Sequence, residues 1–236
     1  MNYAIIAAGE GSRLAQEGIS LPKPLVKLDG KEMIRRLIDI FLNNNAASIS
    51  VIINEEMKEV QDYVSGLKLE VPFNIVVKST PSSMHSFFEL RNFLRDGKFC
   101  LTTVDTVFDE EEFSRFIQAF DADTKNDGMM AVTDYIDDEK PLYVKVDEKM
   151  NIIGFLDEAN DCNYISGGIY CLTPKAIDTL EACLNAGQSR MRNFQRQLVT
   201  DNLKLKAYPF SKILDVDHAE DIKKAEQFVK NKNVKN

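Results

Sequence analysis

The sequence has few of the side chains that usually bind zinc or form disulfides. Only four cysteines and two histidines, His85 and His218, occur among 236 residues, and tryptophan is absent. The cysteines show no CxxC spacing, so neither a structural zinc site nor a disulfide framework is favoured. We expect the cysteines to be buried apolar thiols.

The sequence also lacks a membrane-spanning segment and an excess of basic residues. No apolar run approaches the roughly 18 residues that a spanning helix needs, and the N-terminus carries no basic leader. The formal charge of −8 argues against nucleic acid or an anionic membrane as the main partner. We therefore expect a cytoplasmic protein that binds neither nucleic acid nor membrane.

Short β-rich runs alternate with helix-length amphipathic segments, without repeats or an obvious linker. In the first half the expected strands are 2–8, 48–54, 73–79 and 98–105, with helices at 31–44, 55–67 and 82–97. This βαβαβαβ order predicts a mostly parallel sheet with helices on both faces.

The second half is less regular. Strands are expected at 128–135, 141–148, 151–158, 166–172, 204–210 and 212–217, and helices at 173–185, 192–199 and 219–231. Thr173 is the expected N-cap of the first of these helices, with Pro174 at its first position. We expect a single domain over 1–236, an α/β three-layer α/β/α sandwich around a Rossmann-like, mostly parallel mixed sheet.

The stretch AAGEGSRL, residues 7–14, follows the first expected strand. It does not fit the dinucleotide fingerprint, because Leu14 stands where the third glycine belongs, and no P-loop string occurs. The glycines would still let backbone N–H groups approach an anion, and Arg13 offers a planar fork of donors to phosphate oxygens. The alternative is a tight turn with a surface arginine.

The triplet Pro22-Lys23-Pro24 follows soon after. Each proline fixes its own φ, and Pro24 also biases Lys23 toward an extended backbone, so the lysine has less freedom to lose on binding. A solvated lysine in a stiff loop is the alternative if the triplet is considered alone.

Together, AAGEGSRL and PKPL resemble the opening signature of the nucleotidyltransferases that join an NTP to a sugar phosphate or a similar phosphorylated alcohol. LTTVD (101–105), ISGGIY (165–170) and LDVDHAEDI (214–222) resemble later segments of that family. The resemblance implies the nucleotide-diphospho-sugar transferase type of fold. It also implies a nucleotide-binding half over about 1–125 and an acceptor-binding half over about 126–236.

The resemblance implies site residues as well. Catalytic roles fall to Arg13 and Lys23, and nucleotide contacts to Ala8, Gly9, Gly11, Ser12, Arg13, Lys23, Ser82 and Ser83. Mg²⁺ would be held by Asp105 with Asp217 or Asp215, and the acceptor by Asp157, Ser166 and Gly167. Arg190, Arg192 and Arg196 could reach the acceptor phosphate. Several of these residues have a plainer alternative: a strand-end N-cap or turn for Asp105, helix capping for Asp215, Asp217, Ser82 and Ser83, and a solvated helix face for the arginines.

The chemistry of the family explains these residue types. An acceptor phosphate near neutral pH is already largely ionised, so the main obstacle is the approach of one anion to another. A divalent metal, Arg13, Lys23 and loop N–H groups would reduce that repulsion. The expected function is Mg²⁺-dependent transfer of NMP from an NTP to a sugar 1-phosphate, which releases pyrophosphate and forms an NDP-sugar.

Two alternatives stay open. One is a cytidylyltransferase for a non-sugar phosphate such as phosphocholine, since Ser166 replaces the asparagine of the family's sugar-binding strand. The other is a nucleotide-binding regulatory protein without turnover, against which the joint presence of Arg13, Lys23, Asp105 and Asp217 counts. Nucleobase, acceptor and oligomeric state, a homo-oligomer included, are left open by the sequence.

Overall fold

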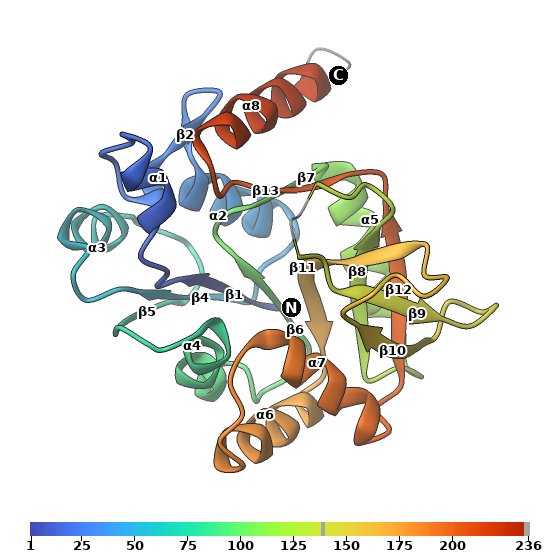
Figure 1. The fold of residues 1–236 in the computed structure, drawn as a ribbon. Helices are drawn as coiled ribbons and strands as arrows, with labels where there is room; N and C mark the ends of the chain where they lie inside the picture. Colours follow the sequence, from blue (N-terminus) through green and yellow to red (C-terminus); the bar gives the residue numbers. More distant parts are fainter. Residues whose placement is uncertain (138–139, 234–236) are drawn as a thin grey trace.

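The chain folds around one mixed sheet of nine strands (Figure 1). The computed structural model describes residues 1–137 and 140–233. Strand order is β10-β9-β11-β6-β1-β4-β5, and β8 pairs with both β11 and β12. The strands are β1 (Asn2–Ala7), β4 (Ser48–Ile53), β5 (Phe73–Val77), β6 (Phe99–Thr103), β8 (Gly128–Thr133), β9 (Tyr143–Val146), β10 (Ile152–Leu156), β11 (Tyr164–Leu172) and β12 (Leu205–Phe210).

Parallel pairing joins β6, β1, β4 and β5, which are the four strands expected from the first half of the sequence. The second half enters through β11, which runs antiparallel to β6, β8 and β9. A strand of the less regular half therefore lies directly beside the parallel strands. The sheet is continuous across both halves of the sequence.

Helices cover both faces of this sheet, as expected for three layers (Figure 1). They are α1 (Ser12–Gln16), α2 (Met33–Asn43), α3 (Lys58–Ser65), α4 (Ser83–Leu90), α5 (Glu110–Ala122), α6 (Lys175–Asn185), α7 (Met191–Thr200) and α8 (Ala219–Asn233), with short 3₁₀ turns at Lys23–Leu25 and Arg91–Phe93.

The central strand β1 shows why both faces are covered. Successive side chains of a strand point to opposite faces. Tyr3 and Ile5 pack into the apolar core beneath α2 and α5, whereas Ala4 and Ile6 pack into the core beneath α4, α6 and α7. All four are buried, so β1 reads as a continuous apolar run. The expected three-layer α/β/α fold is confirmed.

Two small two-stranded sheets flank the main one. β7 (Thr106–Phe108) pairs antiparallel with β13 (Ile213–Asp215), and β2 (Lys27–Leu28) pairs with β3 (Lys31–Glu32). The β7–β13 pair joins the turn after β6 to the segment before α8. Through this pair, distant parts of the chain meet at the carboxyl end of the parallel strands.

Two local expectations are wrong. Lys23 is not extended but opens a 3₁₀ turn, in which Leu25 N–H donates to Pro22 O and Val26 N–H to Lys23 O. The missing N–H of a proline in the first turn removes no bond that this turn needs. Thr173 is not the N-cap of α6, because the helix begins at Lys175 with Pro174 in the cap position, and the Thr173 hydroxyl is buried without a partner among the described residues.

Within the described part of the chain, no helix combines the length and the apolar character required to cross a membrane. All four cysteines are free thiols, and three of them are buried.

Candidate active site

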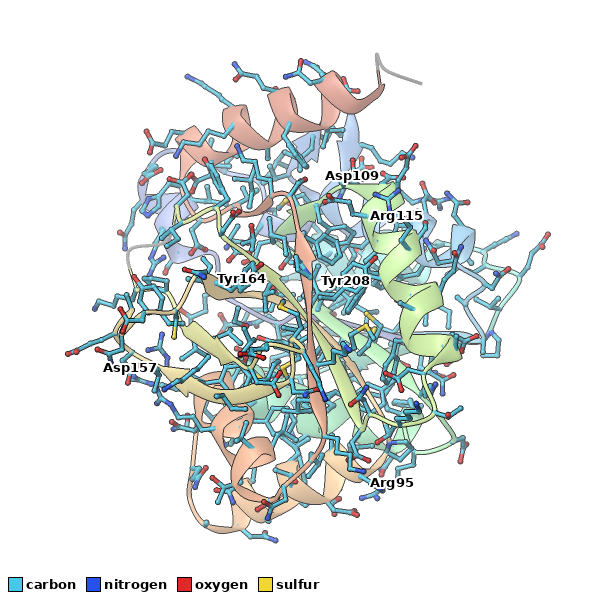
Figure 2. The ribbon with its side chains drawn as sticks, turned by 90° about the vertical axis from the view of Figure 1, so that its right-hand side faces the viewer. Arg95, Asp109, Arg115, Asp157, Tyr164 and Tyr208 are labelled. Carbon is cyan, nitrogen blue, oxygen red and sulfur yellow. The ribbon has the colours of Figure 1, made fainter. Side chains whose placement is uncertain are left out.

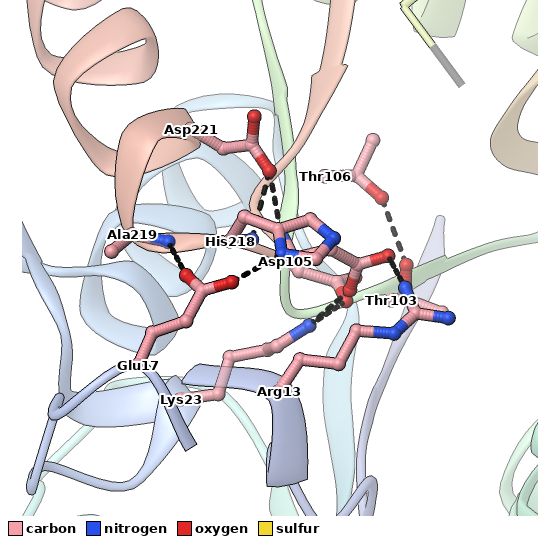
Figure 3. Close-up of polar contacts among 10 residues, drawn as sticks. Arg13, Glu17, Lys23, Thr103, Asp105, Thr106, His218, Ala219 and Asp221 are labelled. Atoms are coloured by element: carbon pink, nitrogen blue, oxygen red, sulfur yellow. Dashed lines mark hydrogen bonds and ion pairs between the residues drawn. The ribbon is translucent and has the colours of Figure 1, made fainter. Parts of the chain in front are cut away.

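Four charged side chains meet between the end of β6 and the start of α8 (Figure 3). Lys23 Nζ donates to Asp105 Oδ2 at 2.8 Å and to Asp217 Oδ1 at 2.7 Å. Arg13 Nη1 donates to the second oxygen of Asp217 at 2.9 Å. We call Lys23, Asp105 and Asp217 the acid–lysine centre. Its lysine bonds span 82 and 194 residues of sequence, so only the fold can assemble it.

The two aspartates are brought together by backbone pairing. Asp105 lies in the turn between β6 and β7, and Asp217 follows β13. The β7–β13 register places Asp215 opposite Thr106, and one residue further along Val216 N–H donates to Asp105 O at 3.1 Å. The backbone positions of Asp105 and Asp217 are therefore set by the pairing of β7 with β13.

The segment that carries Asp217 is held from both sides. The carboxylate of Asp221 accepts from the backbone N–H of Asp217 at 3.2 Å and of His218 at 2.8 Å. Glu17, just after α1, lies 2.6 Å from the His218 ring and also accepts from Ala219 N–H (Figure 3). Asp221, not Asp217, thus supplies the cap at the start of α8, and the Asp217 side chain is directed to Lys23 and Arg13.

Lys23 approaches the glycine loop closely. Gly11 has a φ of 62°, a left-handed conformation that favours glycine, and a Cβ there would lie 3.4 Å from the Cβ of Lys23. Only 12% of the Lys23 side chain is exposed. The glycine loop and the lysine turn therefore form one packed unit.

Charge neutralisation controls protonation in this centre. Burial alone would lower the pKa of Lys23, but the attraction of Asp105 and Asp217 outweighs it and holds that pKa above its ordinary value. Burial would likewise raise the pKa of Asp217, yet Lys23 and Arg13 hold it below its ordinary value. Both groups are charged at neutral pH.

A cavity of about 570 Å³ opens on one side of the acid–lysine centre. Its lining includes Ala8, Gly9, Gly11, Ser12, Lys23, Ser82, Ser83 and Asp105. The structure therefore brings every residue expected to bind nucleotide into one cavity except Arg13. That arginine lines the neighbouring cavities on the Asp217 side.

Ser82 and Ser83 lie at the far wall of this first cavity. Ser82 occupies the N-cap position of α4, but its side chain makes no capping bond and instead lies 2.9 Å from His85 Nδ1. Thr80 and Ser86 share a hydroxyl–hydroxyl bond of 2.6 Å beside them. The wall thus presents several hydroxyl groups.

Asn54 is a cavity residue that the sequence reasoning missed. Its side chain donates to Ala8 O and accepts from Ser79 Oγ and Glu56 N–H, so it ties together the ends of β1 and β4 and the segment after β5. Its position directly after an expected strand was the available signal, because chemistry in open α/β sheets gathers at strand ends.

A second cavity of about 360 Å³ opens on the other side of Asp217. Its lining includes Arg13, Ser166, Gly167, Asp215 and Asp217. The acid–lysine centre therefore lies between two cavities, with Asp105 facing the first and Asp217 the second.

Two expected acceptor residues line this second cavity from β11. Ser166 donates to Gln195 Oε1 at 2.9 Å, and the buried Gln195 also donates to Tyr170. A Cβ on Gly167 would collide with the side chain of Ile213, so β11 and β13 approach closely only because this residue is glycine. Gln195 was not singled out by sequence.

The third expected acceptor residue, Asp157, is not among the described lining residues of either cavity. It follows β10, is 59% exposed, and accepts from Arg192 at 2.6 Å and from Arg196 at 2.7 Å. Figure 2 shows Asp157 at the margin of the molecule. Its role stays a prediction. The two arginines are not a merely solvated face, since both also bond backbone carbonyls.

The acid–lysine centre fits a magnesium ion by its chemistry. Mg²⁺ binds through one or two carboxylates and completes its shell with waters and substrate phosphates. Asp105 and Asp217 each direct an oxygen to a common point, at which a cation, the Lys23 ammonium, is stabilised. Among the described residues no group of three or more His, Cys, Asp or Glu side chains could hold a metal. Binding of Mg²⁺ by Asp105 and Asp217 therefore requires further ligands from a substrate.

A glycine loop after β1, a lysine between two carboxylates and a cavity on each side are features of a phosphate-transfer enzyme of the nucleotidyltransferase class. The sequence profile of the family described as "Nucleotidyl transferase" matches residues 3–232. The chain belongs to this family, and the expected enzyme class is confirmed at that level.

The individual relatives that match this chain are only about a quarter identical to it. The chain is 24% identical over 223 residues to the "Bifunctional protein GlmU" of Thermodesulfovibrio yellowstonii, a match that covers 89% of this chain and 47% of that protein. It is 25% identical over 190 residues to the "Probable mannose-1-phosphate guanylyltransferase 1" of Oryza sativa subsp. japonica, which covers 77% and 52% respectively. The chain spans about half the length of these relatives.

Solved structures share the fold over nearly their full length. An inositol-1-phosphate CTP transferase from T. maritima superposes with a TM-score of 0.81 at 20% identity, covering 97% of this chain and 96% of that one. A putative glucose-1-phosphate thymidylyltransferase from Bacillus anthracis gives 0.84 at 16% identity, covering 98% and 96%. The nucleotide-diphospho-sugar transferase type of fold is thereby confirmed.

Proposed function

We propose that this chain is a Mg²⁺-dependent nucleotidyltransferase that transfers NMP from an NTP to a sugar 1-phosphate, releasing pyrophosphate and forming an NDP-sugar. The observation that carries the proposal is the acid–lysine centre between two cavities. One cavity is lined by the glycine loop, which suits a triphosphate, and the other is lined by Arg13, Ser166 and Gly167, which suit a phosphorylated alcohol.

The origin of the lining residues supports the assignment of the two halves. The first cavity is built from residues 6–105, within the proposed nucleotide half of about 1–125. The second is built from residues 133–224, apart from Arg13, within the proposed acceptor half of about 126–236. Transfer would occur where the halves meet.

The reaction that we propose is attack of an acceptor phosphate oxygen on the α-phosphorus, with pyrophosphate leaving. Backbone N–H groups of Gly9, Gly11 and Ser12 would bind the triphosphate, and Ser82 and Ser83 would face the base. Lys23 would stabilise the charge that develops on the leaving group, and Arg13 would reach it through the small cavity that it lines with Gly11 and Lys23. Mg²⁺, bound at Asp105 with Asp217 or Asp215, would neutralise part of the phosphate charge and orient the phosphates. No general base is needed, because the acceptor phosphate is already ionised.

Relatives named for sugar-phosphate substrates support this substrate class. A mannose-1-phosphate guanylyltransferase and a putative glucose-1-phosphate thymidylyltransferase are among the similar proteins. The proposed partners are thus an NTP and a sugar phosphate, with a homo-oligomer open and a cytoplasmic location consistent with this metabolism.

One observation favours a second candidate, a cytidylyltransferase for a non-sugar phosphate such as phosphocholine. The second cavity includes Tyr135, Asp137 and Glu220. Tyr135 already has a cation at its ring face, since Lys212 Nζ lies 4.1 Å from the ring centroid. Aromatic faces and carboxylates are the groups that recognise a quaternary amine.

Pyrophosphate release from the four common NTPs, each paired with sugar 1-phosphates, inositol 1-phosphate and phosphocholine, tests both candidates. Turnover confined to one NTP with sugar 1-phosphates is the expected result. Turnover with phosphocholine alone would favour the second candidate. Nucleotide binding without pyrophosphate release from any pair would instead indicate a regulatory protein.

A further inference from the structure

The ammonium of Lys23 lies at the point shared by the two carboxylates that would hold the metal. It is 2.8 Å from an oxygen of Asp105 and 2.7 Å from an oxygen of Asp217. With 12% of the side chain exposed, it is not a freely solvated lysine. The free protein therefore already holds one cation between these oxygens.

The backbone that carries the two carboxylates is held by contacts that do not involve the lysine. Val216 N–H donates to Asp105 O, and the Asp221 carboxylate fixes the backbone of Asp217 and His218. Removal of the ammonium would leave two carboxylates close together on backbone segments that stay in place. Such a pair is a binding site for a hard cation.

A divalent ion and the ammonium are expected to exclude each other at these oxygens. Both would contact the same two carboxylates, so their like charges would repel at short range with little water between them.

The ammonium of Lys23 can bind anionic partners other than the two carboxylates. Lys23 lines the first cavity beside Gly11 and Ser12, and its flexible four-carbon stem carries a compact charge. A polyanion in that cavity offers the ammonium new oxygen partners, and its departure from the carboxylates would expose them. Arg13 can stay on Asp217 throughout, because it binds the other oxygen.

We propose that Lys23 acts as an internal counter-ion that closes the metal site of the free protein and opens it when a nucleotide's phosphates draw the ammonium away. Divalent metal alone then binds weakly, and metal and nucleotide bind with positive coupling. By thermodynamic linkage each raises the affinity of the other by the same factor. The identity of the ligand in the first cavity rests on the proposed function, but the closure by Lys23 does not.

Direct binding of Mn²⁺ to the full chain without nucleotide tests this, with free Mn²⁺ measured by electron paramagnetic resonance. Mn²⁺ serves as the probe because it shares the preference of Mg²⁺ for oxygen ligands. Lys23→Met is expected to bind Mn²⁺ at least about tenfold more tightly than wild type, within the range typical of coupling between sites. The matched control Lys27→Met, at an exposed lysine nearby in sequence, should leave Mn²⁺ binding unchanged.

Two further measurements test where the Mn²⁺ binds and whether its binding is coupled to that of a nucleotide. The double variant Lys23→Met with Asp105→Asn should lose the gain, which locates the Mn²⁺ at the carboxylate pair. In wild type, α,β-methylene analogues of the NTPs should strengthen Mn²⁺ binding by more than they do in Lys23→Met. If Lys23→Met does not fold by circular dichroism, Lys23→Gln carries the same comparison.

Equal Mn²⁺ affinity of wild type and a folded Lys23→Met variant would overturn the proposal. The proposal would also fail if Lys27→Met increased Mn²⁺ affinity as much as Lys23→Met does. These outcomes are separate from the proposed function. Failure of every NTP and acceptor pair to release pyrophosphate would reject the transferase activity and leave the Mn²⁺ comparison intact.

Discussion

Glu17 and His218 lie 201 residues apart in sequence, yet the glutamate carboxylate is 2.6 Å from the imidazole. The second oxygen of Glu17 accepts from the next backbone amide, that of Ala219. One carboxylate thus joins the end of α1, which follows the glycine loop, to the start of α8, which follows Asp217. The glycine loop and the second carboxylate of the acid–lysine centre are held as one unit by this contact.

Glu17→Ala should lower kcat/KM roughly 2- to 10-fold, because misplacement of a catalytic group by a fraction of an ångström weakens its interaction with the reacting phosphate. The amide of Ala219 should also lose hydrogen-exchange protection. Glu148→Ala, in an exposed turn, is the matched control. Unchanged kinetics together with unchanged exchange at Ala219 would show that the contact is dispensable.

Lys23→Ala should lower kcat at least about 100-fold, the scale found when one preorganised charge-stabilising donor is removed. The variant should remain folded, because the Lys23 side chain bonds carboxylates and supports no part of the apolar core. Kinetics with an established substrate pair and circular dichroism check both points, with Lys27→Ala as the control. Turnover within a few-fold of wild type would remove Lys23 from the mechanism.

Activity should require a divalent metal. EDTA should abolish pyrophosphate release, and Asp105→Asn or Asp217→Asn should greatly reduce it, since an ion held by few carboxylates loses much of its affinity with one charge removed. Excess Mg²⁺ should partly restore either variant, and Asp121→Asn, on the exposed side of α5, should behave as wild type. Full activity in EDTA would contradict this mechanism.

Asp157→Ala tests a proposed acceptor residue that is not among the described lining residues of either cavity. If Asp157 accepts hydrogen bonds from sugar hydroxyls, acceptor kcat/KM should fall roughly 10- to 150-fold while the KM for NTP hardly changes. Because Arg192 and Arg196 pair with Asp157 in the free protein, each should also be changed to alanine. A loss reproduced by the arginine variants would indicate that Asp157 acts by holding α7. Unchanged acceptor kinetics in Asp157→Ala would exclude both roles.

Asp127 should make stability depend on pH at acid values. Partial burial acts against its charge, but hydrogen bonds from Lys175 and from the Lys204 backbone outweigh it and hold its pKa below the ordinary 3.8. A lowered folded-state pKa gives stability that is present above the unfolded value and is lost as the pH falls through the folded value.

Asp127→Asn should therefore lower Tm by about 2–6 °C at pH 7, and by much less near pH 3. Thermal unfolding at the two pH values measures the difference, with Asp121→Asn as the control. An equal loss of Tm at both pH values would show that the effect is not one of charge.

The parallel half of the fold could be predicted from sequence because its signals are local. Each of the strands β1, β4, β5 and β6 is a short, mostly apolar run, and the main helices between them carry their own apolar faces. The glycine loop and Lys23 could be found for the same reason, since they lie in one short stretch. Local details were less accurate: Pro174, not Thr173, occupies the cap position of α6, and Lys23 opens a 3₁₀ turn where an extended backbone was expected.

The sequence by itself determined the layer architecture, because that depends on periodicity, and the class of enzyme, because short contiguous motifs resemble those of a known family. Only the tertiary structure decided which charges meet. Lys23 bonds Asp217 across 194 residues because β7, three residues long, pairs with β13, and so short a strand has no periodicity to detect. The same holds for Glu17 with His218 and for Asp157 with its two arginines, since ion pairs between distant segments leave no pattern along the chain.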